Sequence, residues 1–120
     1  MGEQMVLKNG SVVFEKGLPG FDGLKNFELA ALEQVGFFNL SSSEQENISL
    51  LLIDPYIYFP NYEIEIDDNT TKRLGIKDAT DVLVLSVVTL NDDVEKITVN
   101  LRAPIIINLT TGKCEQVILD

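Results

Sequence analysis

The chain has 120 residues, of which 45% are hydrophobic, so it can bury a packed core as a single domain over residues 1–120, and a disordered chain is excluded. Its formal net charge of −10 repels nucleic acid and anionic membrane surfaces and favours basic partners. The absence of histidine and the single cysteine exclude Ser-His and Cys-His nucleophiles, an intrachain disulfide and a structural zinc site, so we expect no catalytic residue, no metal and no cofactor.

The first third of the chain predicts short strands joined by a glycine-rich turn. Residues 11–15 (SVVFE) are rich in β-branched side chains and predict a strand. Residues 16–23 (KGLPGFDG) contain three glycines and a proline, which indicates a turn or tight loop. Residues 27–34 (FELAALEQ) leave helix and strand both open, because their propensity favours a helix and their apolar spacing also suits a strand. Residues 35–40 (VGFFNL) predict the next strand.

The middle of the chain predicts two strands of different character. Residues 41–47 (SSSEQEN) are typical of a polar hairpin loop. Residues 48–53 (ISLLLI) are continuously apolar, so we expect a strand that is central in its sheet and covered on both faces. Residues 62–67 (YEIEID) alternate between apolar and acidic side chains, which predicts a half-buried strand with an acidic outer face.

The best helix candidate is residues 68–76 (DNTTKRLGI). Asp68 or Asn69 can cap its start, two basic residues suit its last turn, and Gly75 can end it.

The last third of the chain predicts further strands. Residues 81–90 form a long β-rich run, and residues 96–101 alternate again. Residues 103–109 and 114–119 flank a TTGK hairpin signal, and Pro104 marks a strand start, an edge or a bulge. The whole pattern predicts an all-β, mostly antiparallel fold: a small β-barrel-like or sandwich domain with at most one or two short helices.

The negative charge is concentrated in one part of the chain. Residues 26–71 contain no Lys or Arg, and they contain nine acids: Glu28, Glu33, Glu44, Glu46, Asp54, Glu63, Glu65, Asp67 and Asp68. Two interpretations are open: a solvated acidic surface that aids solubility, or a patch that faces a partner.

An aromatic cluster lies inside this acidic region. It places four aromatic side chains within seven positions, namely Tyr56, Tyr58, Phe59 and Tyr62. Strand-like alternation would put Tyr56 and Tyr58 on one side and Ile57 and Phe59 on the other. The cluster is either core or an interface ridge, because tyrosine combines a large apolar face with a polar tip.

The remaining candidates for chemistry are carboxylates. Asp67–Asp68 and Asp92–Asp93 fall at predicted turns, where aspartates bond their own backbone, and neither pair has the ligand spacing of a calcium loop. Asp54 follows an apolar run and precedes a proline, so it either caps a turn or is presented for binding.

Three motifs in series resemble the flagellar assembly factor FliW family: KGLPGF (16–21), LLIDPYIYFPNYEIEI (51–66) and ITVNLRAPIIINLTTGKCEQVIL (97–119). The resemblance implies a small β-barrel-like protein without catalysis that binds flagellin in the cytoplasm. It also implies binding of the translational regulator CsrA, an RNA-binding dimer that represses flagellin synthesis. Flagellin export then frees the protein to bind CsrA and restore flagellin translation.

We expect a cytoplasmic protein that is a monomer when free, with CsrA and flagellin as partners and no direct contact with nucleic acid or membrane. The first ten residues hold no apolar stretch long enough for a signal peptide. The predicted partner-binding residues are Asp54, Tyr56, Tyr58, Phe59, Tyr62, Glu63, Glu65, Asp67 and Asp68.

Two other classes remain open. One is a non-catalytic carbohydrate-binding β-domain, although such domains usually expose tryptophan and this chain has none. The other is a structural subunit of a larger assembly, which should self-associate.

Overall fold

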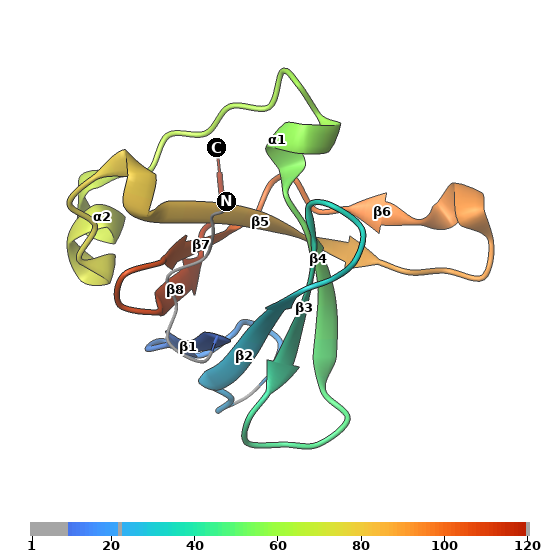
Figure 1. Ribbon diagram of the computed structural model, residues 1–120, viewed down its shortest axis with the longest axis horizontal. Helices are drawn as coiled ribbons and strands as arrows, with labels where there is room; N and C mark the ends of the chain where they lie inside the picture. Colours follow the sequence, from blue (N-terminus) through green and yellow to red (C-terminus); the bar gives the residue numbers. More distant parts are fainter. Residues whose placement is uncertain (1–9, 22, 120) are drawn as a thin grey trace.

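The computed structural model describes residues 10–21 and 23–119, and it is a mixed β-barrel (Figure 1). The strands are β1 (Ser11–Phe14), β2 (Asn26–Ala31), β3 (Phe37–Ser42), β4 (Ser49–Ile53), β5 (Val82–Thr89), β6 (Thr98–Val99), β7 (Ile105–Asn108) and β8 (Lys113–Gln116). The helices are α1 (Pro55–Tyr58) and α2 (Asp68–Leu74), and short 3-10 turns span Ala79–Asp81 and Val94–Lys96. The prediction that no signal peptide begins the chain falls mostly on residues outside the described part.

Seven strands close the barrel. Their order is β4-β3-β2-β1-β8-β7-β5, and β4 pairs with β5 to complete the ring. Every pair is antiparallel except β1 with β8, which is parallel. The eighth strand, β6, pairs with the far end of β5, and this hairpin projects beyond the barrel (Figure 1). The expected all-β, mostly antiparallel, barrel-like fold with two short helices is therefore confirmed.

The barrel interior holds the main core. Phe14 and Phe27 meet edge to face with ring centroids 5.4 Å apart. Leu52 and Leu85 are fully buried beside them, which agrees with the expected central position of β4 between β3 and β5. Cys114 is also buried here, so its role is packing.

A second apolar cluster lies on the outer face of the barrel. Leu74 from α2, Val84 from β5 and Ile106 from β7 form its buried centre. Ile64 and Ile66, from the segment between the helices, pack over them. The continuous apolar run of β7 is thereby explained, because alternate residues serve the two clusters.

The strand predicted at residues 62–67 is absent. Its alternation is real, because Tyr62, Ile64 and Ile66 are half-buried while the acids between them are exposed. No strand of the described chain lies beside it, so no ladder forms. The alternation of residues 62–67 therefore predicted correctly which side chains are buried, but it predicted wrongly that the segment pairs with another strand.

Other boundaries shift by smaller amounts. The segment 27–34, which left helix and strand open, is strand β2 as far as Ala31 and a loop after it, because it pairs between β1 and β3. The predicted strand at 96–101 shrinks to Thr98–Val99, since the chain leaves the ladder before Pro104. β7 begins directly after Pro104, as expected of a residue that cannot donate a ladder hydrogen bond.

Helix α2 ends at Gly75 as predicted, with a left-handed φ of 67° at that residue. Its N-cap is Asp67, not Asp68 or Asn69: the Asp67 carboxylate accepts a hydrogen bond from the Thr70 backbone N–H at 2.7 Å. The cap lies one residue earlier because Asp67 is the last residue with extended backbone, and Asp68 already stands in the first turn.

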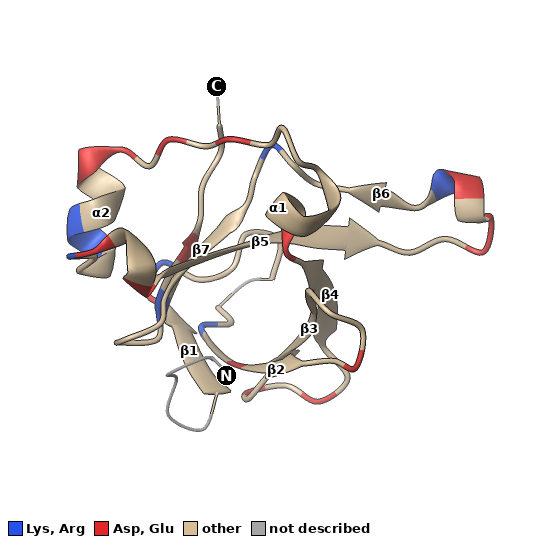
Figure 2. Ribbon diagram, turned by 45° about the horizontal axis from the view of Figure 1, so that its top comes forward, with Lys and Arg blue, Asp and Glu red and all other residues tan. Residues whose placement is uncertain are grey.

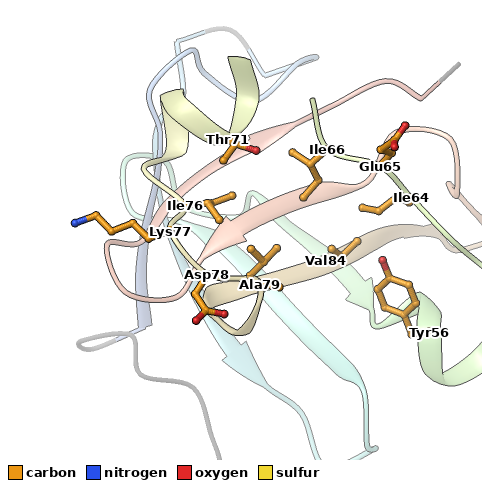
Figure 3. A pocket seen from close by; sticks show the side chains of 11 residues that line it. Tyr56, Ile64, Glu65, Ile66, Thr71, Ile76, Lys77, Asp78, Ala79 and Val84 are labelled. Carbon is orange, nitrogen blue, oxygen red and sulfur yellow. The ribbon is translucent and has the colours of Figure 1, made fainter. Parts of the chain in front are cut away.

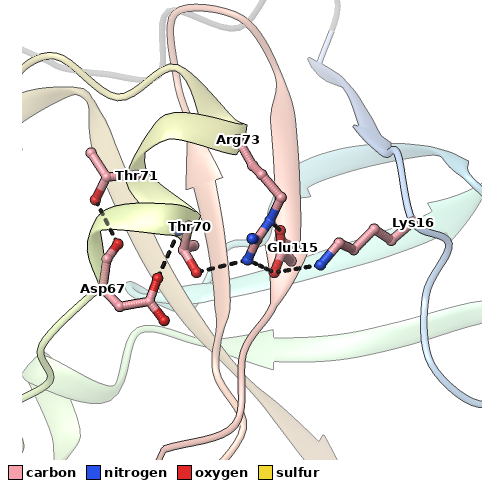
Figure 4. A network of polar contacts seen from close by, with 6 residues as sticks. All are labelled: Lys16, Asp67, Thr70, Thr71, Arg73 and Glu115. Carbon is pink, nitrogen blue, oxygen red and sulfur yellow. Dashed lines mark hydrogen bonds and ion pairs between the residues drawn. The ribbon is translucent and has the colours of Figure 1, made fainter.

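An ionic network fixes α2 against the barrel (Figure 4). The Arg73 guanidinium donates to both carboxylate oxygens of Glu115 on β8, at 3.0 and 2.8 Å. Lys16, in the glycine-rich loop, approaches the same carboxylate at 3.7 Å. One side chain thus joins the loop, the helix and the strand.

Candidate partner-binding surface

The aromatic cluster begins with a capped helical turn. The Asp54 carboxylate accepts a hydrogen bond from the Tyr56 backbone N–H at 2.9 Å, and Pro55 stands in the first helical position, where its missing N–H costs nothing. Of the two interpretations of Asp54, the structure supports the cap. The Asp-Pro pair is itself a helix-start signal in the sequence.

This turn corrects the predicted strand-like alternation. Tyr56, Ile57 and Tyr58 are all exposed, at 44%, 49% and 38% of their surface, because α1 is too short to bury more than Pro55. Phe59, just after the turn, is half-buried. Ile57 therefore joins Tyr56 and Tyr58 on the surface instead of facing away from them.

The loop between β2 and β3 holds α1 in place. The Tyr58 hydroxyl donates to the Val35 carbonyl at 2.6 Å, and the Tyr58 ring packs edge to face on Phe37 with centroids 5.5 Å apart. The Asp54 N–H donates to the Gly36 carbonyl at 2.7 Å. Val35 itself is 71% exposed. We call the exposed group Val35, Tyr56, Ile57 and Tyr58 the apolar patch.

Tyr62 joins the apolar patch to the outer cluster. Its ring lies 5.5 Å from that of Tyr56, and its hydroxyl donates to the Leu101 carbonyl at 2.7 Å. Burial raises the pKa of Tyr62, with a smaller contribution from Tyr56, and burial also raises the pKa of Tyr56, with a smaller contribution from Asp54. Both phenols therefore stay neutral and able to donate at physiological pH.

From Tyr62 the chain crosses the outer face of the barrel to α2 (Figure 2). We call this segment, residues 62–68, the acidic arm. Its four acids are exposed: Glu63, Glu65, Asp67 and Asp68. Among the described residues, no Lys or Arg forms an ion pair with any of them. The Asp67 carboxylate is engaged as the α2 cap, and the Thr70 backbone hydrogen bond holds its pKa below the ordinary value.

A cavity of about 540 Å³ opens between the acidic arm and β5 (Figure 3). Most of its wall is apolar, formed by Tyr56, Ile64, Ile66, Ile76, Val82 and Val84. Glu65 and Asp78 lie at its rim, while the Lys77 side chain runs away from it (Figure 3). Two of the predicted residues, Tyr56 and Glu65, thus line one hollow.

A smaller hollow of about 290 Å³ lies on the other side of α1, and Tyr58, Phe59 and Tyr62 line it together with Leu101. Three of the four predicted aromatics thus line one hollow, and Tyr56 continues this surface through its ring contact with Tyr62. Two residues of that surface were missed by sequence reasoning, Val35 and Ile57. The helix-start signal at Asp54 could have revealed Ile57, but nothing local places Val35 beside α1.

The described residues contain no group of three or more His, Cys, Asp or Glu side chains placed to hold a metal ion. Nor do they include any helix with the length and apolar character needed to cross a membrane. What the surface offers is apolar area, tyrosine rings and negative charge, which is the chemistry of protein recognition.

Known proteins resemble this chain over nearly its whole length. The family described as FliW protein matches residues 1–120. The flagellar assembly factor FliW of Thermosipho africanus is 44% identical over 122 residues, covering 100% of this chain and 84% of that protein. The FliW of Clostridium botulinum strain Alaska E43 is 43% identical over 110 residues, covering 91% of this chain and 78% of that protein. A crystal structure of the flagellar assembly factor FliW superposes with a TM-score of 0.85 at 39% identity, covering 99% of this chain and 84% of that one. The chain therefore belongs to the FliW family of flagellar assembly factors, a family of non-catalytic proteins.

Proposed function

We propose that this protein binds flagellin and the translational regulator CsrA in the cytoplasm and relieves CsrA's repression of flagellin translation. Membership in an assembly-factor family supports a protein-binding role over carbohydrate binding. The observation that carries the proposal is the exposed apolar patch beside an arm with four exposed acids. An apolar centre with a charged rim is the usual anatomy of a recognition surface.

Charge supplies a mechanism for the action on CsrA. RNA binding by a basic protein depends on phosphate contacts and counterion release. An acidic domain docked beside the RNA site repels the phosphate backbone within a Debye length, roughly 8 Å at physiological salt. Because binding free energies are reciprocal, RNA on CsrA weakens the binding of this protein by the same factor.

A gel shift with CsrA, flagellin leader RNA and this protein tests the charge mechanism. We expect the triple variant Glu63→Gln, Glu65→Gln, Asp68→Asn to keep part of its CsrA binding but to displace RNA less effectively than the parent. The difference between variant and parent should be larger at low salt. Asp67 is left intact because it caps α2. The matched control neutralises three exposed acids elsewhere, Glu28, Glu33 and Glu46.

If the arm variant evicts RNA as well as the parent does, the acidic arm is not the cause. If the control loses as much as the arm variant, total charge matters and its position does not. If neither CsrA nor flagellin binds the parent protein, the proposed function is wrong.

The apolar patch is tested with single substitutions. We expect Tyr56→Ala or Ile57→Ala to weaken binding of at least one partner about thirtyfold, because a central interface side chain commonly contributes about 2 kcal/mol. Val94→Ala, on the projecting hairpin and 76% exposed, is the control and should bind normally. Calorimetric titration measures the affinity. Normal binding by both patch variants, with normal melting, would exclude the patch.

A further inference from the structure

The backbone of the acidic arm is unusually free for a segment packed on a core. Among the described residues, the N–H and C=O groups of residues 63–66 take part in no hydrogen bond with the rest of the chain. The nearest bonds lie at the ends, where the Tyr62 N–H donates to Phe59 and the Asp67 carbonyl accepts from Thr71. A row of unpaired backbone groups in a segment with strand-like alternation is a template for an added strand.

Space for such a strand exists beside the arm. On one side lies the cavity of about 540 Å³, which Val82 and Val84 of β5 line. Figure 3 shows Val84 across the cavity from Ile64 and Ile66. On the other side, a hollow of about 430 Å³ separates Glu65 and Ile66 from Ile118 and Leu119. The arm thus runs between two hollows instead of between two strands. The cavity toward β5 is the larger and more apolar of the two.

The alternation of the arm specifies what the added strand should contain. Neighbouring strands present directly opposite side chains on the same face. Side chains opposite Ile64 and Ile66 would point to the apolar floor, and those opposite Glu63 and Glu65 would point to solvent beside a carboxylate. The best complement therefore alternates apolar residues with Lys or Arg.

We propose that the acidic arm accepts an extended segment of a partner protein as an added β-strand on its β5 side, with apolar residues facing Val82 and Val84 and basic residues facing Glu63 and Glu65. Backbone hydrogen bonds to residues 63–66 hold the segment, and the alternating side chains select it. The proposed function supplies only the identity of the partner protein that carries the segment. The mode of binding is argued from the arm itself.

The first test uses an acetylated, amidated peptide of about seven residues in which lysine and valine alternate. Titration into the isotope-labelled protein, followed by amide NMR, should shift the resonances of residues 63–66 and of Val84. Hydrogen exchange should slow by about tenfold or more at alternate amides of the arm, because only every second N–H of a strand points to a given edge. Absence of shifts in the arm, or shifts without slowed exchange, overturns strand addition.

Backbone methylation separates strand addition from capture of the side chains alone. A peptide whose lysine and valine residues all carry N-methyl groups should not bind. A peptide methylated only at the lysines, or only at the valines, should still bind, because the unmethylated N–H groups all point to one edge and the peptide can turn that edge toward the arm. If the fully methylated peptide binds like the parent, the backbone is not used. Binding only by a helical peptide of the same composition would likewise overturn the inference.

Protein variants place the site. Glu65→Lys should weaken the lysine–valine peptide about three- to tenfold, because it replaces cross-strand attraction by repulsion. Glu46→Lys, an equally exposed charge reversal in the β3–β4 loop, should have little effect. Equal loss in both variants would mean that net charge, not the arm, attracts the peptide.

The same exchange measurement with purified flagellin or CsrA distinguishes the two proposals. If a partner binds and the arm amides stay unprotected, strand addition fails and the proposed function stands. If neither partner binds but the peptide protects the arm, the proposed function fails and strand addition stands.

Discussion

At the scale of single residues, carboxylates in this protein divide into those that hold the fold and those that are free. Asp54 and Asp67 accept backbone hydrogen bonds at helix starts, and Glu115 pairs with Arg73. Glu63 and Glu65 have no such partner among the described residues. Sequence reasoning grouped Asp54 and Asp67 with the binding residues, and their capping geometry explains them without a partner. Whether they also contact one stays a prediction.

Glu115→Gln should lower the free energy of unfolding at neutral pH by about 1–2 kcal/mol, because it breaks a bidentate pair whose acid is largely shielded from solvent. The control Glu15→Gln removes an exposed pair with Lys113 and should cost less than about 0.5 kcal/mol. Urea unfolding of the three proteins measures both.

The stabilisation by Glu115 should also depend on pH. The hydrogen bond from Arg73 holds the pKa of Glu115 below its ordinary value of 4.5, so the carboxylate binds protons more weakly when the protein is folded. The stabilisation is therefore complete above about pH 4.5 and is lost as the pH falls through the lower folded-state pKa. The difference between parent and Glu115→Gln should shrink on acidification, and a difference that is constant down to pH 3 would contradict this assignment.

At the scale of elements, the binding surface depends on how α1 sits on the β2–β3 loop. Gly36 lies under α1 with φ of 83°, and a Cβ there would stand 2.9 Å from the Ile57 Cδ1 atom and 3.2 Å from the Tyr58 ring. An added Cβ would therefore displace the Ile57 side chain and the Tyr58 ring, which the Val35 carbonyl and Phe37 hold in place. Preorganisation of Tyr58 by these contacts lowers the entropy cost of binding.

Gly36→Ala should therefore cost more than the strain of a left-handed backbone alone. Gly20→Ala is the matched control, because Gly20 has φ of 89° with no atom within 4 Å of an added Cβ. We expect about 1 kcal/mol of destabilisation for the control, and a further loss plus weaker partner binding for Gly36→Ala. Denaturation and calorimetric titration test this, and equal behaviour of the two variants would show that the contact with α1 is unimportant.

At the scale of the whole molecule, stability and recognition are assigned to different parts. The closed barrel buries the apolar cluster in its interior, while the helices and the acidic arm lie outside the ring (Figures 1 and 2). The apolar patch is exposed on α1 and the β2–β3 loop. A closed ring has no edge strands of its own, so the acidic arm and the projecting hairpin, which lie outside it, are the described segments best placed for pairing.

Leu85→Ala should destabilise the protein by about 2–5 kcal/mol, because the residue is fully buried in the inner cluster and the truncation leaves a cavity. The control Leu90→Ala lies directly after β5, where the side chain is 66% exposed, and it should change the free energy of unfolding by less than about 0.5 kcal/mol. Thermal melting compares the two. A small effect at Leu85 would mean that the barrel interior is not the principal core.

The sequence by itself determined the local features of this protein. β-Branched and apolar runs located most strands, Gly75 ended α2, and three motifs indicated the family, because these signals depend on neighbouring residues. Only the tertiary structure decided that residues 62–67 cross the barrel without a ladder and that Val35 meets Tyr58. The physical reason is that hydrogen-bond pairing and contacts between distant segments depend on where the closed barrel places those segments. The alternation of buried and exposed side chains, by contrast, is the same for a paired strand and for an extended segment that packs on a core.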